Sequence, residues 1–123
     1  MRNVVITGVG IKSCIGNDYA EVLANLQNAK SGIVFNEKYS EMGFRSCVSG
    51  SVNIDLSEHI DRKLLRFMCE SAGYAYLATK DALKMSGIDE SHLDSPKIGI
   101  VSGSGVDSTR VMLESGDIAR EKG

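Results

Sequence analysis

The sequence has few of the features that would place it in a specialised class of proteins. Its 123 residues contain no tryptophan, one proline and three cysteines, and no apolar run approaches the roughly 18 to 20 residues that a membrane span needs. The cysteines, Cys14, Cys47 and Cys69, lie far apart and form no C-x-x-C pair, so neither a disulfide framework nor a zinc site is indicated. These absences favour a reducing cytoplasm and predict no membrane partner.

The chain also lacks an excess of charge of one sign. Fourteen Lys and Arg residues against sixteen Asp and Glu residues leave a net charge of -2, so no basic field for nucleic acid is expected. His59 and His92 have no ligating residues at metal-site spacing, and no metal is predicted. With 42% apolar and 24% charged residues, the composition is that of a soluble globular domain or part of one.

Two apolar runs predict buried strands. One spans Asn3 to Thr7 and ends in a glycine turn, and the other spans Lys97 to Ser102 and ends in a second glycine turn. Strands of this kind form a parallel pair through a right-handed crossover, and they need helices on both faces of a wider sheet. Two strands cannot make that sheet. The sequence therefore predicts an α/β fold that is incomplete within this chain, as the start of a longer protein or as a chain that needs a partner.

Helical spacing of apolar residues predicts two helices. The first spans about Tyr19 to Lys30, with Asp18 and Glu21 spaced as a capping box, and the second spans about Asp61 to Ser86 and ends at Gly87. Small residues lie on more than one face of the second helix, which is typical of a helix buried on several sides. Between residues 33 and 54 only short edge strands or loop are expected, and no element is predicted for the polar stretch 114–123.

The glycine turns and Cys14 are further candidates for a chemical role. Gly8-x-Gly10 follows a predicted strand, but Ser13 stands where a dinucleotide-binding fingerprint has its third glycine, so a nucleotide-binding subunit is only an alternative. Cys14 lies ahead of a helix and near Lys12, which could lower a thiol pKa, but the sequence places no base beside it. A packing or loop role is the expectation for Cys14.

The strongest local signal is a cluster of cations at the start of the long helix. Arg62 and Arg66 are four residues apart, with Lys63 beside them, although cations in a first turn oppose the helix dipole. Such a departure from a local rule indicates function, namely docking of an acidic protein or a phosphate. The alternative is a solvated helix start in which Asp61 and Glu70 are the ion partners.

Four segments in this order resemble the β-ketoacyl-acyl-carrier-protein synthases, which are condensing enzymes of the thiolase fold, and type I of them in particular. The segments are Val5-Ile6-Thr7-Gly8-Val9-Gly10-x-x-Ser13-x-x-Gly16-Asn17, Ser31-Gly32-Ile33, Asp61-Arg62-Lys63-x-x-Arg66-Phe67-Met68 and Gly99-Ile100-Val101-Ser102-Gly103-Ser104-Gly105. The resemblance implies that residues 1–123 are the amino-terminal portion of a synthase domain with a layered α-β-α-β-α core. It also implies a decarboxylative Claisen condensation of an acyl group with malonyl-acyl-carrier protein in fatty-acid synthesis.

In this family a cysteine and two histidines catalyse the reaction, and no residue of this chain matches them. The resemblance implies no cofactor of the enzyme itself, because phosphopantetheine arrives on the acyl-carrier protein. It implies carrier binding by Arg62, Lys63 and Arg66, with Arg45 as a fourth member, and a homodimer in the full-length parent. The resemblance also implies that Val106 and Asp107 belong to the loop that, in this family, reaches across the homodimer to the partner's acyl pocket, although they depart from the small residues common there. A stand-alone module that binds an acidic carrier without catalysis stays an alternative.

Overall fold

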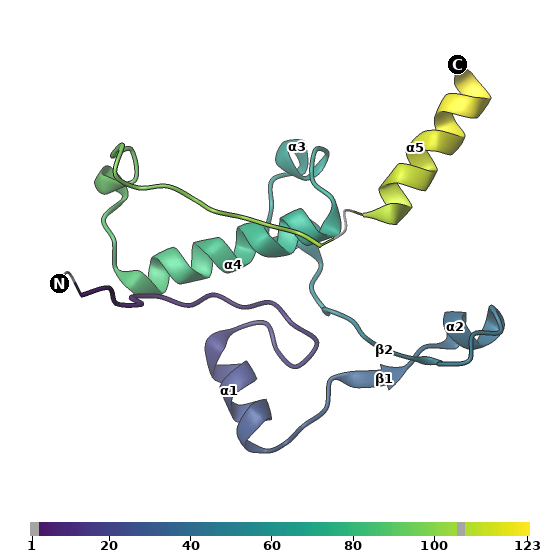
Figure 1. Ribbon diagram of the computed structural model, residues 1–123, viewed down its shortest axis with the longest axis horizontal. Helices are drawn as coiled ribbons and strands as arrows, with labels where there is room; N and C mark the ends of the chain where they lie inside the picture. The colour runs from purple at the N-terminus through teal and green to yellow at the C-terminus, as the bar shows by residue number, and fades with distance from the viewer. Residues whose placement is uncertain (1–2, 106–107) are drawn as a thin grey trace. The chain divides into compact units, whose positions relative to one another are not determined.

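A computed structural model describes residues 3–105 and 108–123 (Figure 1). The regular elements are α1 (Tyr19–Gln27), β1 (Ile33–Phe35), α2 (Glu37–Glu41), β2 (Val48–Gly50), α3 (Arg62–Leu65), α4 (Glu70–Ser86) and α5 (Thr109–Lys122), with 3₁₀ turns at Leu56–Glu58 and Glu90–His92. They divide into two compact units, of which the first holds residues 3–55 and 77–87 and the second holds 56–76, 88–105 and 108–123. Helix α4 contributes to both units.

Helix α1 begins where the sequence predicts. The Asp18 carboxylate accepts a hydrogen bond from the Glu21 main-chain N–H (2.9 Å), and the Glu21 carboxylate accepts one from the Asn17 N–H (2.8 Å). These two bonds satisfy N–H groups that have no partner within the helix, which is the purpose of a capping box. The helix ends at Gln27, slightly earlier than Lys30, and the chain reverses through Ala29, whose φ of 51° is unusual for a residue other than glycine.

The glycine turn after residue 7 packs against helix α4. A Cβ atom on Gly10 would lie 2.7 Å from the Ala78 carbonyl carbon and 2.9 Å from the Ala82 nitrogen, and one on Gly8 would lie 2.9 Å from the Ser86 nitrogen. Residues 3–10 accordingly run alongside α4 in the first unit (Figure 1). Close approach of two backbones accounts for these glycines without a bound nucleotide.

Four hydrophobic side chains are buried among the described residues. Val22 and Leu77 belong to the first unit, and Leu56 and Ile60 belong to the second. Leu56 packs on α4 where Gly73 leaves room, because a Cβ atom on Gly73 would come within 2.6 Å of a Leu56 methyl group. The first unit also contains the antiparallel pair β1 and β2, in which Ile33 lies opposite Gly50 and Phe35 opposite Val48. Helices with a two-stranded sheet agree with part of an α/β domain.

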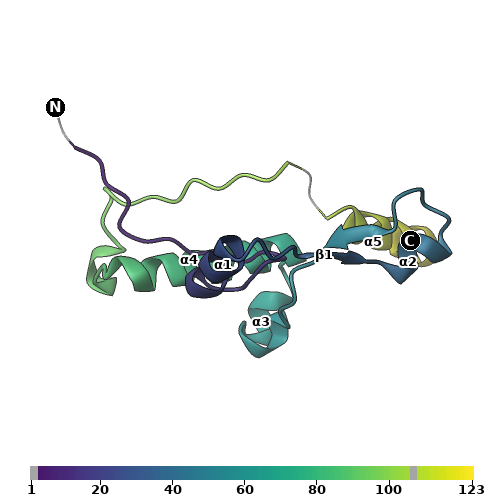
Figure 2. The same cartoon turned by 90° about the horizontal axis from the view of Figure 1, so that it is seen from below.

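The prediction of a parallel strand pair was wrong for the described residues. Residues 3–7 and 98–102 are extended but unpaired, as Figures 1 and 2 show, with Val4 94% and Val101 101% exposed, and Lys97 lies in a turn. A strand exists only when a neighbouring strand completes its hydrogen bonds, and no such neighbour stands beside either segment in the described ranges. The apolar pattern therefore marks segments suited to burial, while the sheet that would bury them is missing from this part of the molecule.

Two helix predictions also need correction. The long helix expected over residues 61–86 is interrupted at residues 66–69, where the Phe67 and Met68 N–H groups bond to the third preceding residue instead of the fourth. Its predicted end is confirmed, since α4 stops at Ser86 and Gly87 has a φ of 68°. The stretch 114–123, for which no element was predicted, lies mostly within α5, and the Ser108 hydroxyl accepts a hydrogen bond from the Val111 N–H at its start.

Candidate functional site

The predicted cation cluster is carried by the short helix α3 and the turn that follows it. The Asp61 carboxylate caps the helix by accepting from the Lys63 N–H (2.8 Å), and the Leu65 N–H bonds to the Asp61 carbonyl (2.9 Å). Beyond α3 the Phe67 N–H donates to the Leu64 carbonyl (3.0 Å), which keeps the chain coiled. A single turn thus carries all three predicted cations, and we call Arg62, Lys63, Leu64, Arg66 and Phe67 the α3 surface.

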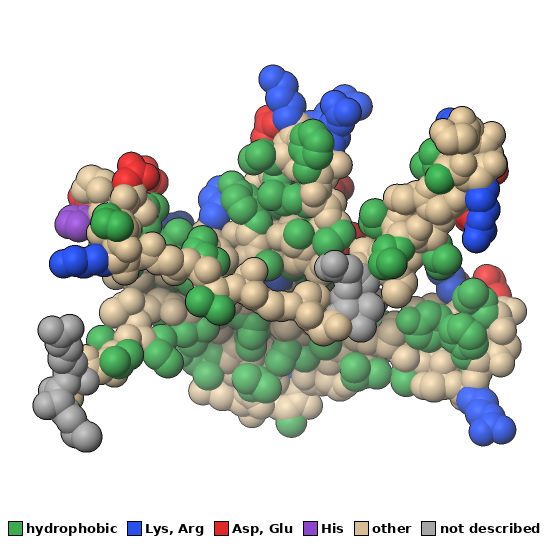
Figure 3. Space-filling model, turned by 45° about the horizontal axis from the view of Figure 1, so that its top comes forward, with side chains coloured by type: hydrophobic (Ala, Val, Ile, Leu, Met, Phe, Trp, Pro, Cys, Tyr) green, Lys and Arg blue, Asp and Glu red, His purple; other side chains and the backbone are tan. Residues whose placement is uncertain are grey.

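The three cations of the α3 surface are exposed and have no ion pair within the described residues. Glu70, one of the two expected partners, instead pairs with Arg110 (3.2 Å). The carboxylate of the other expected partner, Asp61, accepts a hydrogen bond from the Lys63 main-chain N–H. The alternative of a helix start neutralised by Asp61 and Glu70 is therefore not what the structure shows. Figure 3 shows Lys and Arg side chains projecting over α3, with hydrophobic side chains directly beneath them.

Arg45 is exposed in the segment between α2 and β2. It belongs to the first unit, whereas the α3 surface belongs to the second. Its membership of a common carrier-binding surface stays a prediction. Val106 and Asp107 lie outside the described residues, so their predicted role at an acyl pocket also stays a prediction.

A cavity of about 570 Å³ lies in the second unit beside those two positions in sequence. The first turns of α4 form one wall, and the second glycine loop forms the other. Its lining residues are Cys69, Ser71, Ala72, Ala75, Ser102, Gly103, Ser104 and Gly105. The Cys69 thiol and the Ser71 hydroxyl are 3.1 Å apart and bonded to each other. The lining consists mainly of small side chains and main-chain atoms. Such a lining can form the wall of a binding pocket, but it offers few reactive groups.

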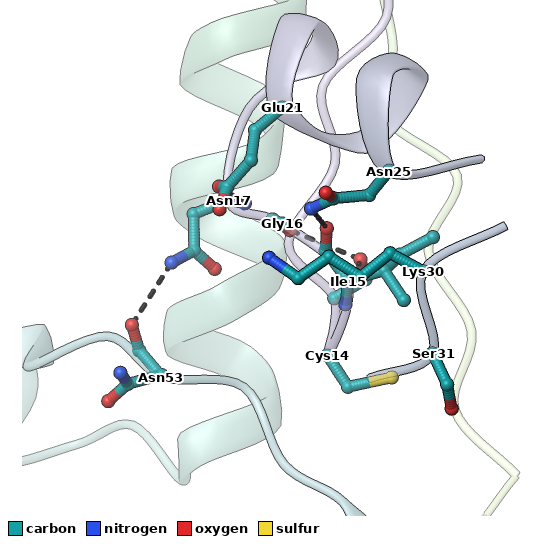
Figure 4. Close-up of a pocket in the computed structure, with 10 residues that line it drawn as sticks. Cys14, Ile15, Gly16, Asn17, Glu21, Asn25, Lys30, Ser31 and Asn53 are labelled. Atoms are coloured by element: carbon teal, nitrogen blue, oxygen red, sulfur yellow. Dashed lines mark hydrogen bonds between the residues drawn. The ribbon is translucent and has the colours of Figure 1, made fainter. Parts of the chain in front are cut away.

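A smaller cavity of about 210 Å³ in the first unit has Cys14 among its lining residues (Figure 4). Its amide side chains fix the loop backbone: Asn25 Nδ2 donates to the Ile15 carbonyl (2.5 Å) and Asn17 Nδ2 donates to the Asn53 carbonyl (3.0 Å). Asn17 Oδ1 is buried with no hydrogen-bond partner in the described structure. These bonds give the cavity a structural role as the anchor of the loop ahead of α1.

The surroundings of Cys14 explain why glycine stands at two nearby positions. A Cβ atom on Gly32 would lie 2.9 Å from the Cys14 Sγ atom, and one on Gly50 would lie at the same distance. The cavity lining includes Glu21, whose carboxylate is already bonded to the Asn17 N–H, and it includes no histidine. This geometry agrees with the expected packing role of Cys14.

No group of three His, Cys, Asp or Glu side chains lies close enough to hold a metal ion in residues 3–105 and 108–123. Within the same ranges, no helix combines the length and the apolar composition that crossing a bilayer requires.

The structure agrees with part of an α/β domain, and its α3 surface carries three exposed cations that have no ion pair in the part of the chain that is described. The family model "Beta-ketoacyl synthase, N-terminal domain" matches residues 1–122, and the chain belongs to this family. It is 44% identical over 120 residues to the 3-oxoacyl-[acyl-carrier-protein] synthase 1 of Haemophilus influenzae, a match that covers 98% of this chain and 30% of that protein.

Two further relatives extend the comparison. The synthase 1 of Escherichia coli K12 is 40% identical over 121 residues, which is 98% of this chain and 30% of that protein. The synthase 2 of Staphylococcus aureus strain COL is 31% identical over 106 residues, which is 85% of this chain and 26% of that protein. The chain thus spans about 30% of the length of the synthase 1 relatives that it matches. The predicted family is confirmed.

Sequence reasoning missed two features of the structure. One is an ion pair between Lys12 and Asp81, and the other is the exposure of Phe67 beside the cations. The sequence offers no local signal for the first, because Lys12 and Asp81 are 69 positions apart in the chain. Nothing in the sequence distinguishes Phe67 from an ordinary buried aromatic residue.

Proposed function

We propose that this chain is the amino-terminal portion of a condensing enzyme of fatty-acid synthesis. The parent would join an acyl group to malonyl-acyl-carrier protein by a decarboxylative Claisen condensation and would act as a homodimer in the cytoplasm. The family match and the names of the relatives support this proposal. The exposed apolar segments 3–7 and 97–102 fit the layered thiolase-like core that such a parent would complete.

Within that parent, the described residues would supply carrier docking, dimer surface and pocket wall. No catalytic role is assigned to Cys14, Cys47, Cys69, His59 or His92. The pocket-wall role falls to the 102–105 loop and to Val106 and Asp107 beyond it. The enzyme would need no cofactor of its own, because phosphopantetheine would arrive on the carrier.

Carrier docking by the α3 surface rests on one observation. Three exposed cations occupy a single turn and lack ion partners in the described structure, on a chain whose net charge is -2. A local positive field of this kind attracts an acidic partner and mainly raises the rate of association. The names of the relatives include an acyl-carrier protein, which makes such a carrier the proposed partner.

Charge reversal tests this proposal. Replacing Arg62, Lys63 and Arg66 by Glu should lower the association rate constant for acyl-carrier protein by roughly tenfold or more at low ionic strength. The matched control reverses three other exposed cations, Lys38, Lys97 and Lys122, and so changes the net charge equally. Stopped-flow or surface-plasmon measurements on the protein at its native length give the rates, and equal binding by both triple variants would remove the proposal. Arg45→Glu, measured alongside, decides whether Arg45 belongs to the surface.

A further inference from the structure

The α3 surface carries apolar area as well as charge. Phe67 is 87% exposed and Leu64 is 48% exposed, while Leu65 and Met68 are partly covered and Ile60 is 4% exposed. Leu64 and Phe67 are three residues apart and joined by the bond between their backbones, so they belong to neighbouring positions of one turn. The turn therefore has an anchored side and an outward side, and two large apolar side chains lie on the outward side.

The exposed ring lies among the cations. The Arg66 guanidinium carbon is 6.0 Å from the centre of the Phe67 ring, which is at the outer limit of a cation–π contact. Lys63 precedes Phe67 by four residues, and Arg62 begins the same turn. A partner that places carboxylates on these cations would bring its own surface over the Phe67 ring.

We propose that Phe67, together with Leu64, determines the specificity of this docking surface by receiving an apolar side chain from the acidic face of the carrier. The inference rests on the proposed carrier docking and adds a second recognition element to it. Charge complementarity identifies the occupant, because the surrounding cations are unpaired in the described residues. An acidic protein without an apolar side chain at the right place would be attracted but held only briefly.

The charged and the aromatic side chains act at different stages of binding. Exposed charges act over a distance, raise the association rate and lose their effect as salt screens them. An aromatic side chain acts only after contact, when its burial removes apolar area from water, and this slows dissociation. Interfaces are enriched in aromatic and arginine residues for these complementary reasons.

The experiment compares single variants of the protein at its native length, with acyl-carrier protein as the probe. Phe67→Ala should raise the dissociation rate constant about tenfold, as expected for a central aromatic contact, and leave the slope of affinity against salt concentration unchanged. Arg66→Gln should instead lower the association rate and reduce that slope. Phe67→Leu should restore most of the affinity. Phe35→Ala, at a phenylalanine 62% exposed on β1, is the matched control and should have no effect.

Each contrary result has a distinct meaning. If Phe67→Ala binds normally while Arg66→Gln is impaired, carrier docking stands and the role of Phe67 is refuted. If Phe67→Ala lowers the melting temperature and Leu64→Ala, tested in parallel, binds normally, another part of the protein covers Phe67 and the inference is also refuted. If the unaltered protein does not bind the carrier, the proposed docking function fails, and the inference fails with it.

Discussion

The Lys12 ammonium lies 2.6 Å from a carboxylate oxygen of Asp81 and 2.6 Å from the main-chain oxygen of Asn17. The Lys12 side chain is only 12% exposed, whereas that of Asp81 is 44% exposed. An ammonium group so largely removed from water requires polar partners of this kind. The pair ties the loop that follows the glycine turn to helix α4, and both partners belong to the first unit.

The different burial of the two partners predicts unequal effects of their removal. Asp81→Asn leaves the covered ammonium without its anion and should lower the free energy of unfolding by about 1–3 kcal/mol. Lys12→Met should cost less, because the Asp81 carboxylate can be hydrated where it stands. Denaturant unfolding of the two single variants and the double variant gives the coupling between them, expected at about 0.5–3 kcal/mol for groups in contact. Strictly additive losses would mean that the contact contributes nothing to stability.

The close packing of Gly10 against α4 gives a second prediction. It tests the effect of a steric clash without a contribution from backbone strain. Gly10 does not have a positive φ, so an alanine there meets no backbone strain, but its Cβ atom would collide with the main chain at Ala78 and Ala82. Gly10→Ala should destabilise the protein by about 1–3 kcal/mol through overpacking. Gly99→Ala is the matched control, since a Cβ atom at Gly99 meets nothing within 4 Å. Comparable stability of the two variants in thermal melts would show that the turn does not pack closely on α4.

The start of one helix and the end of another could be predicted from the sequence, because residues next to them in the chain determine them. Asp18 with Glu21 predicted the start of α1, and Gly87 predicted the end of α4. The strands predicted at residues 3–7 and 97–102 do not form in the described structure. Strand pairing depends on a neighbouring strand, and the apolar pattern of a single segment does not show whether such a neighbour is present. The break after Arg66 has no sequence signal such as proline or glycine, and the continuous helical pattern concealed it.

The same distinction applies to the site. The positions of Arg62, Lys63 and Arg66 on one turn followed from their spacing. Their lack of ion partners among the described residues did not, since Glu70 pairs with Arg110, forty positions further along the chain, and Asp61 caps the backbone of α3. The exposure of Phe67 is likewise a consequence of how the turn is anchored at Ile60, Leu65 and Met68, which composition alone does not reveal.

Tyr74 is expected to titrate at higher pH than an ordinary tyrosine. Partial burial raises the pKa of the Tyr74 phenol, and the negative charge of Glu70 raises it further. The folded-state pKa of Tyr74 lies above the unfolded value of about 10, so ionisation of the phenol at high pH favours the unfolded state. The contribution of Tyr74 to the free energy of unfolding is therefore complete below pH ~10 and is lost as the pH rises through the folded-state pKa. Ultraviolet titration of phenolate absorbance, with Tyr74→Phe to assign the signal, measures this shift.

Glu70→Gln separates the two causes at Tyr74. Removal of the charge should lower the Tyr74 pKa but leave it above that of free tyrosine, since desolvation is the larger cause. Glu70 also pairs with Arg110, so the variant removes that ion pair and leaves Arg110 with Glu114 (3.6 Å) as its partner. A Tyr74 pKa that does not change in Glu70→Gln would show that the carboxylate does not influence the phenol in solution.

The exposed apolar residues predict how the 123-residue chain behaves when it is produced alone. Large hydrophobic side chains are exposed on the unpaired segments and on α5, where Met112 and Leu113 are each 68% exposed. Surfaces of this kind and free strand edges recruit partners, so the isolated chain should be marginally stable, oligomeric or strongly bound by hydrophobic dyes. Size-exclusion chromatography, dye fluorescence and thermal melts test this, with the protein at its native length as the reference. A monomer that melts sharply and binds no dye would show that these segments cover one another in solution, and the proposal that they complete a larger core would lose its support.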